Sequence, residues 1–283
     1  MGITQERDAD DAVEVNVNAR MKQRPLFVLF DLDGCLYPIE NGYEGRCRER
    51  VFEFMREQLN YETIEGAKNA WAKEFKVYNQ TLKSLRKLGH TEFKKELYWE
   101  RTRGRAEEFL RCDLEVCECL KKMKCLKFVL TNCAEKQARE CLEQLGLEDE
   151  FEEVYGADFM GDSCKPEKEA IERVLRDVKK RFFCRPQNNS SSISEEPFKF
   201  KANEVFFFED SLKNLASAKA NFNITGVLVK GKTLLEEEEE EEEGEKNNST
   251  ARTTGTNYSA KEFKQIKKPS IKELEHIYPE LFL

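Results

Sequence analysis

Short runs of apolar residues, separated by amphipathic stretches, constrain the fold of this chain more than any other feature. The clearest runs lie at 26–30, 126–130 and 205–208, and shorter ones lie at 154–155 and 227–229. Such runs are typical of strands that are buried on both faces. Between them, apolar residues recur at helical spacing, as in Ala138, Cys141, Leu142 and Leu145. Buried strands that alternate with amphipathic helices predict an α/β fold, built on a parallel sheet covered by helices on both faces.

The region between the first two predicted strands has a different pattern. Apolar residues keep a helical period over 47–59 and over 64–85, and no strand signal interrupts residues 38–110. We therefore predict an all-helical cap domain inserted after the first strand, where it acts as a lid over the edge of the sheet. The predicted boundaries are 38–110 for the cap, and 25–37 with 111–231 for a Rossmann-like core.

Three segments have the low hydrophobicity of solvated chain. We expect a disordered tail at 1–24, a flexible Asn- and Ser-rich insertion at 185–203, and an acidic low-complexity insertion at 232–268. The last residues, 269–283, are predicted to form a C-terminal helix.

The formal net charge of −8 comes from one segment. The glutamates at 236–243, with Glu245, outnumber that excess, so the rest of the chain is close to neutral. A nucleic-acid binder needs a basic face, so a net negative charge argues against that function. The argument is weak here, because the glutamate tract alone accounts for the negative net charge. No apolar run approaches the roughly 18 residues of a membrane span. We expect no nucleic-acid or membrane partner, and the tract is either a solvated insertion or a site for a basic partner.

The ten cysteines indicate the compartment. They show no disulfide-framework spacing and no CxxC pair, and most lie in apolar patterns, as buried reduced thiols do. The polar N-terminus has no apolar stretch that could serve as a signal peptide. We therefore expect a cytoplasmic protein, with the nucleus as a second location.

Two carboxylates follow the first predicted strand directly. Asp31 and Asp33 are two residues apart at the strand end, so they point the same way, while Leu32 points to the opposite side. Paired carboxylates repel one another unless a cation bridges them. One of them can attack phosphorus while the other transfers the proton. The alternative is an acidic turn, because Asp-Gly pairs such as Asp33–Gly34 are common in turns.

Polar residues also follow two other strands and one loop. Thr131 and Asn132 could bind phosphate oxygens, and Lys165, with Pro166 at the first position of a helix, could neutralise charge. The hard oxygens of Glu209 and Asp210 could complete a magnesium site. Helix capping and a solvated lysine are the alternatives. Because the carboxyl ends of parallel strands share one edge, the order of these groups predicts a single site.

At these residues the chain resembles the haloacid dehalogenase-like hydrolases. The four motifs of that superfamily match Asp31–Gly34, Thr131–Asn132, Lys165 and Glu209–Asp210. The segment Asp31–Pro38, together with elements of the helical insert, is similar to the pyrimidine 5′-nucleotidase branch, and the ending Tyr278–Leu281 is similar to its plant-like members.

The resemblance implies a magnesium-dependent phosphatase that acts on nucleoside monophosphates such as UMP and CMP. It implies that Asp31 is the nucleophile that forms an aspartyl-phosphate, and that Asp33 is the general acid and then the general base. Thr131 and Asn132 would hold phosphate oxygens, and Lys165 would neutralise charge. The implied Mg²⁺ ligands are carboxylate oxygens of Asp31 and Asp210 and the backbone carbonyl of Asp33, with Glu209 nearby.

The chain departs from the branch at several positions. Gly34 and Cys35 stand where Asp and Thr are usual, and Ala106 begins a segment that differs from the usual Leu-Pro-Tyr. Because the latter lies in the cap, leaving-group specificity is the most open point. A phosphatase for sugar phosphates or lysophosphatidic acid is one alternative, and a non-catalytic regulatory protein on the same scaffold is another.

Overall fold

The computed structural model of the protein describes residues 25–183, 199–230 and 259–283. The predicted tail at 1–24, most of the 185–203 insertion and the whole glutamate tract lie outside these residues. Within the described part of the chain, no helix has the length and apolar character needed to span a bilayer.

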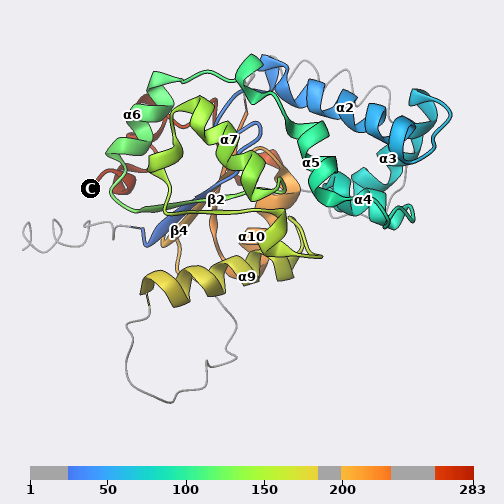
Figure 1. The fold of residues 1–283 in the computed structure, drawn as a ribbon. Coiled ribbons are helices and arrows are strands. Elements are labelled where there is room, and N and C mark those ends of the chain that lie inside the picture. Colours follow the sequence, from blue (N-terminus) through green and yellow to red (C-terminus); the bar gives the residue numbers. More distant parts are fainter. Residues whose placement is uncertain (1–24, 184–198, 231–258) are drawn as a thin grey trace, which may run out of the picture.

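Six parallel strands form one sheet in the order β3–β2–β1–β4–β5–β6, as Figure 1 shows for its centre. The chain places β2 and β3 on one side of β1 and then returns to place β4, β5 and β6 on the other. The order therefore reverses beside β1, and ligands bind at such a point in open α/β sheets. The strands are β1 Phe27–Phe30, β2 Leu126–Leu130, β3 Glu153–Tyr155, β4 Val205–Glu209, β5 Thr225–Val229 and β6 Lys264–Ile266.

Helices cover both faces of the sheet, as predicted for strands without a polar face. Val28 and Phe30 of β1 pack with α6 and α7, whereas Phe27 and Leu29 pack with α9 and α10 on the opposite side (Figure 1). The α/β class and the parallel sheet are thus confirmed. The core helices are α6 Leu114–Lys122, α7 Glu135–Leu145, α8 Ala157–Met160, α9 Lys168–Val178, followed by a π-helical turn Lys179–Phe183, and α10 Leu212–Phe222.

The segment between β1 and β2 is helical and projects beyond the carboxyl edge of the sheet (Figure 1). The helical period predicted over 64–85 is divided between two helices, because Asn79 adopts a left-handed conformation with φ of 53°. Aromatic and aliphatic side chains of these helices form a hydrophobic cluster that also includes Cys133, Ala134 and Ala157 of the core domain. The helices are α2 Tyr43–Gln58, α3 Ile64–Tyr78, α4 Thr81–Lys87 and α5 Lys95–Arg103, with short 3₁₀ turns at Ile39–Asn41 and Ala106–Glu108.

Polar contacts hold this helical cap against the core. Gln80 of the cap donates a hydrogen bond to the backbone carbonyl of Asn132, at a distance of 3.0 Å. Lys83 forms an ion pair with Glu167 in the loop before α9. These contacts connect the cap to the loops that follow β2 and precede α9, so the cap lies closed over the predicted site.

The ends of two predicted segments are wrong. Residues 259–268 were expected within the acidic insertion, but 264–266 form β6, which pairs with β5 and buries Ile266. A three-residue strand is stabilised by pairing with a distant neighbour, which local composition does not reveal. Residues 199–203, expected to be flexible, contact the core instead, where Phe200 donates a backbone hydrogen bond to Phe222.

The predicted C-terminal helix is also wrong in length. It consists of one turn, α12 Ile271–Leu274, and a separate 3₁₀ turn, Pro279–Leu281. Pro279 disfavours helical geometry at the preceding Tyr278, which explains the break. Leu281 is nevertheless fully buried and accepts a backbone hydrogen bond from Lys124, so this segment belongs to the core.

Candidate active site

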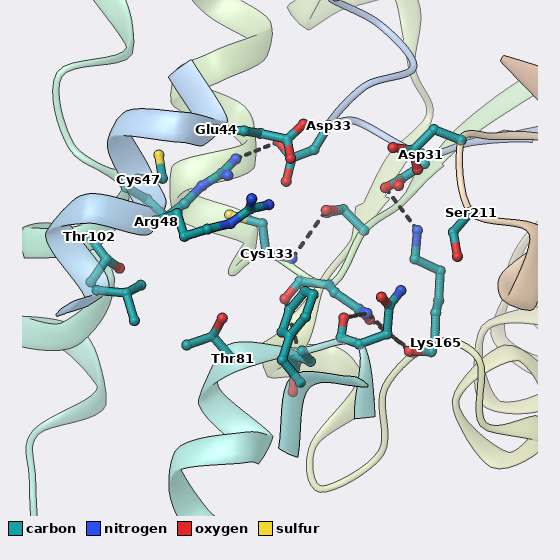
Figure 2. A pocket seen from close by; sticks show the side chains of 18 of the residues that line it. Asp31, Asp33, Glu44, Cys47, Arg48, Thr81, Thr102, Cys133, Lys165 and Ser211 are labelled. Carbon is teal, nitrogen blue, oxygen red and sulfur yellow. Dashed lines mark hydrogen bonds and ion pairs between the residues drawn. The ribbon is translucent and has the colours of Figure 1, made fainter. Parts of the chain in front are cut away.

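The strand-end residues predicted from the sequence lie around one cavity of about 330 Å³. Strands β2, β1 and β4 are neighbours, so their carboxyl ends bring together the residues that follow them (Figure 2). The cavity lies between this edge and the cap, and all seven predicted site residues line it. They are Asp31, Asp33, Thr131, Asn132, Lys165, Glu209 and Asp210.

Lys165 lies at the bottom of the site, with 1% of its side chain exposed. Its Nζ is 2.8 Å from Asp31 Oδ1 and 2.7 Å from Glu209 Oε2. Burial lowers the pKa of this ammonium, but the two carboxylates outweigh it and leave the pKa above its usual value. Lys165 is therefore a permanent cation between two carboxylates, and the alternative of a solvated lysine is wrong.

Three carboxylates form a compact cluster beside this lysine. Oxygens of Asp31, Glu209 and Asp210 all lie within 4.8 Å of one another. Burial, and then repulsion from Asp31, raise the pKa of Asp210 to about 7. Burial likewise raises the pKa of Glu209 to about 7, and it raises that of Asp31 well above the ordinary value. A cluster that resists ionisation in this way, and offers only hard oxygens, fits a divalent cation such as Mg²⁺.

The three carboxylates are not equivalent as ligands. Glu209 Oε2 accepts from Lys165, and its Oε1 accepts from the backbone N–H of Ser211. Asp31 uses only Oδ1 for Lys165 and the N–H of Leu32. Glu209 therefore orients the lysine, and the carboxylates best placed to hold Mg²⁺ are those of Asp31 and Asp210.

Asp33 is held by two residues that the sequence did not single out as site residues. Arg103 Nη2, at the end of α5, lies 2.6 Å from Asp33 Oδ1, and the Tyr37 hydroxyl donates to the same oxygen. Figure 2 shows the resulting position of Asp33, separate from Asp31 and facing the cap. Because Arg103 comes from the cap, the orientation of Asp33 depends on the cap being in place.

The two residues after β2 have different roles. The Thr131 hydroxyl accepts a hydrogen bond from the N–H of Cys133 and keeps its own hydrogen for a phosphate oxygen. The Asn132 amide donates to the carbonyls of Asn79 and Lys165 and accepts from the N–H of Lys165. Both of its N–H hydrogens are used, so the expectation that this amide binds phosphate does not hold. Asn132 instead fixes the cap and the backbone of Lys165.

The capping alternatives also fail. The helix after β2 has Ala134 at its N-cap, so neither Thr131 nor Asn132 caps it. Ser211 occupies the N-cap of α10 but makes no side-chain cap hydrogen bond. The proline expected at the first position of α9 lies before it, since that helix begins at Lys168 with Glu167 as its N-cap. These polar side chains are therefore left for the cavity or for one another.

The two departures beside Asp33 have structural explanations. Gly34 adopts φ of 68°, and a Cβ at this position would lie 2.5 Å from Asp210 Oδ2, so a side chain would displace the carboxylate cluster. The Cys35 thiol donates to the carbonyl of Phe208 at 3.4 Å. The sulfur thus supports the loop after β1 in place of the hydroxyl that is usual in the branch.

Cap residues supply the outer wall of the cavity. Trp71 and Phe75 stack with ring centroids 4.4 Å apart, and the Trp71 N–H donates to Thr81 Oγ1, which fixes the ring. Glu44 and Arg48 lie one helical turn apart on α2. The sequence contained one indication that Glu44 has a functional role. It lies at the start of the apolar stripe that continues with Cys47, and a charged residue is unexpected on such a stripe.

Magnesium binding should depend on pH through Asp210. In metal-free protein, the folded-state pKa of about 7 exceeds the ordinary 3.8, so folded protein keeps a proton that the unfolded chain has released. This group therefore lowers the free energy of unfolding as pH rises from about 4 through 7. Since Mg²⁺ needs the ionised carboxylate, we expect it to raise the melting temperature more at pH 8 than at pH 5.5.

At 100 times the dissociation constant, Mg²⁺ should add about 2.7 kcal/mol at pH 8. Thermal melts with and without Mg²⁺ at the two pH values measure this difference. Asp210→Asn is the control, and it should lose most of the Mg²⁺ shift. Equal shifts at pH 5.5 and pH 8 would contradict the assignment.

Comparisons with known proteins agree with this architecture. The family model of the haloacid dehalogenase-like hydrolases matches residues 27–221. The structure is similar to a HAD phosphatase from Thermococcus onnurineus, with a TM-score of 0.50, 18% identity, and coverage of 90% of this chain and 99% of that one. It is also similar to the L-2-haloacid dehalogenase from Xanthobacter autotrophicus, with a TM-score of 0.49, 16% identity, and coverage of 88% and 97%. The similarity to the Thermococcus protein, at 18% identity, establishes the fold alone, whereas the family match spans most of the chain. This chain belongs to the haloacid dehalogenase-like hydrolases.

Proposed function

We propose that this hydrolase is a magnesium-dependent phosphatase that cleaves nucleoside monophosphates. The observation that carries the phosphatase assignment is Asp33, which is held by Arg103 and Tyr37 two residues after Asp31. An alkoxide leaving group needs a proton, and a positioned carboxyl group can supply it. A halide needs none, so dehalogenation would leave Asp33 and the cation-binding cluster without a role.

The proposed reaction begins with attack of Asp31 on phosphorus. One carboxylate oxygen of Asp31 makes this attack, and the other would hold Mg²⁺ together with Asp210. The bond from phosphorus to the leaving oxygen breaks as the aspartyl-phosphate forms, and Asp33, which must carry a proton at this step, gives it to that oxygen. Asp33 then takes a proton from the water that hydrolyses the acyl phosphate, which restores Asp31.

Charge balance is the main task of the remaining residues. A phosphate dianion that approaches Asp31, Asp33 and Asp210 would be repelled strongly. Mg²⁺ held by Asp31 and Asp210 would neutralise charge on the phosphate oxygens. Lys165 supplies a further positive charge from below, and Thr131 can donate its hydroxyl hydrogen. Positioning and electrostatic stabilisation account for most of the catalysis in phosphoryl transfer.

The shape of the cavity supports a nucleoside as the leaving group. About 330 Å³ is in the usual range for a small-molecule pocket, and the aromatic side chains of Trp71 and Phe75 contribute to its lining. An aromatic lining suits a planar base, because two aromatic rings can pack offset or edge to face. A sugar phosphate has no aromatic ring to pack in this way, and lysophosphatidic acid carries a long acyl chain. We therefore rank UMP and CMP, which the sequence resemblance implies, above both.

A phosphate-release screen against about a dozen monophosphates tests the proposal. We expect the highest kcat/KM for UMP and CMP, lower values for AMP and GMP, and the lowest for glycerol phosphate, glucose 6-phosphate and lysophosphatidic acid. A preference for one of the last three would contradict the nucleotidase assignment while leaving the phosphatase assignment intact. Halide release from 2-chloropropionate, without phosphate release, would contradict both.

A further inference from the structure

The cavity holds an unusual share of polar atoms that lack partners. Among the described residues that line this cavity, four buried side-chain atoms have no hydrogen-bond partner. These four are Glu44 Oε1, Trp99 Nε1, Arg103 Nε and Asn214 Oδ1. A buried polar atom without a partner costs about 1–3 kcal/mol. Their concentration in one cavity indicates a ligand that offers both donors and acceptors beyond its phosphate.

Of the two acceptors among these four atoms, Glu44 Oε1 is the one that the cap contributes. It lies in the first turn of α2, and Figure 2 shows its carboxylate beside that of Asp33. Burial, followed by the charge of Asp33, raises the pKa of Glu44 to about 7, although Arg103 and Arg48 oppose this rise. Its Oε1 has no hydrogen-bond partner. A carboxylate there would repel the phosphate and therefore suits the leaving-group side of the ester.

The cavity-lining face of α2 gives the site a direction. Glu44, Cys47, Arg48 and Val51 follow one another along that face, and Arg48 lies four residues beyond Glu44, about 6 Å along the helix axis. The guanidinium of Arg48 is 5.6 Å from the centroid of the Trp71 ring, which stacks on Phe75. The order from the reacting end is therefore Asp33, then Glu44 with its unpartnered oxygen, then Arg48 beside the aromatic side chain of Trp71.

We propose that Glu44 binds the ribose hydroxyls of a ribonucleoside monophosphate, so that the enzyme discriminates against 2′-deoxynucleotides. This inference rests on the proposed function and assigns a residue to its substrate selection. In any 5′-nucleotide the ribose lies between the ester oxygen and the base. Along α2, Glu44 lies beside Asp33, and Arg48, whose guanidinium is over the Trp71 ring, follows one turn later. A carboxylate oxygen accepts hydrogen bonds from ribose hydroxyls in dinucleotide-binding folds for the same chemical reason.

The test compares Glu44→Ala and Glu44→Gln with wild type on UMP, dUMP and p-nitrophenyl phosphate. A hydrogen bond to a charged group contributes about 1.5–3 kcal/mol, so Glu44→Ala should lower kcat/KM for UMP by about 10- to 150-fold, mostly through KM. The ratio of kcat/KM for UMP to kcat/KM for dUMP should fall towards one. Because p-nitrophenyl phosphate has no ribose, its kcat/KM should not change, so the ratio of kcat/KM for UMP to that for p-nitrophenyl phosphate should fall by the same factor of about 10- to 150-fold. Glu44→Gln keeps one acceptor and should lie between wild type and Glu44→Ala.

Glu49→Gln is the matched control, because Glu49 is on the same helix, exposed, and paired with Arg46. In Glu49→Gln, the ratios of kcat/KM among UMP, dUMP and p-nitrophenyl phosphate should equal those of wild type. An unchanged ratio of UMP to dUMP in Glu44→Ala would overturn the role of Glu44 even though wild type hydrolyses UMP. If both Glu44 variants lose as much kcat/KM on p-nitrophenyl phosphate as on UMP, Glu44 has a structural role, and the proposed contact with ribose is overturned. If wild type hydrolyses p-nitrophenyl phosphate but no nucleotide, the nucleotidase proposal fails first, and this inference fails with it.

Discussion

Asp31→Asn should reduce phosphate release by at least about 10⁴-fold, the loss expected when a covalent nucleophile is removed. The substitution keeps the size of the side chain, and an amide oxygen can still accept the hydrogen bonds from Lys165 and the N–H of Leu32. It also removes one of the mutually repelling carboxylates of the cluster, whose burial raises the pKa of Asp31. We therefore expect a folded protein with a melting temperature at or above that of metal-free wild type.

Steady-state phosphate release and a thermal melt check these two expectations. Trapping with hydroxylamine adds a direct test, because it converts an acyl phosphate to a hydroxamate that mass spectrometry locates on Asp31. Asp158→Asn serves as a control, since Asp158 pairs with Lys95 on the surface, outside the residues that line the cavity. Turnover close to wild type in Asp31→Asn, or a hydroxamate on another residue, would refute the assignment of the nucleophile.

Lys165→Met should have the second largest effect, on stability as well as on activity. The substitution leaves Asp31 and Glu209 facing each other in the interior without the cation between them. Removing one partner of a buried ion pair costs about 3–5 kcal/mol. We expect a loss of this size in the free energy of unfolding at pH 8, and a fall in kcat of about 10²- to 10³-fold from the lost electrostatic stabilisation.

The stability loss should shrink as the pH falls. Without Lys165, the main group that lowers the pKa of Glu209 is gone, so this pKa rises above its present value of about 7. A protonated carboxyl group needs no counter-charge, and the variant should therefore approach wild type in stability at pH 5.5. Urea unfolding at the two pH values measures this. Lys168→Met, three residues further on and exposed, is the control. Equal midpoints for Lys165→Met and wild type at pH 8 would contradict the account.

The sequence was most informative about the strand ends. Asp31, Thr131 and Asp210 each follow an apolar run, and the parallel sheet brings them to one edge because β2, β1 and β4 are neighbours. The prediction worked because strand periodicity is local and parallel strands share their orientation. It was less accurate for Asn132, whose amide is used by the backbones of Asn79 and Lys165. Which hydrogen-bond partners a side chain finds depends on segments distant in the sequence.

Contacts between distant segments also limited what the sequence could predict about the cap. Its helical character followed from the apolar period, but that period did not reveal the break at Asn79. Arg103 and Glu44 belong to helices at opposite ends of the cap segment, and both lie beside Asp33 only because the cap folds back over the sheet edge. Arg103 holds Asp33 in position, and the proposed role of Glu44 concerns the choice of leaving group.

The sequence by itself determined the parallel α/β core, the helical insert and the groups at the carboxyl edge of the sheet, because each depends on periodicity or on a short motif. Only the tertiary structure decided that Lys165 is buried between Asp31 and Glu209, that Arg103 holds Asp33, and that residues 264–266 form a sixth strand. Each of these depends on contacts between segments far apart in the chain. Such contacts are selected by the packing of the whole molecule, which no local pattern records.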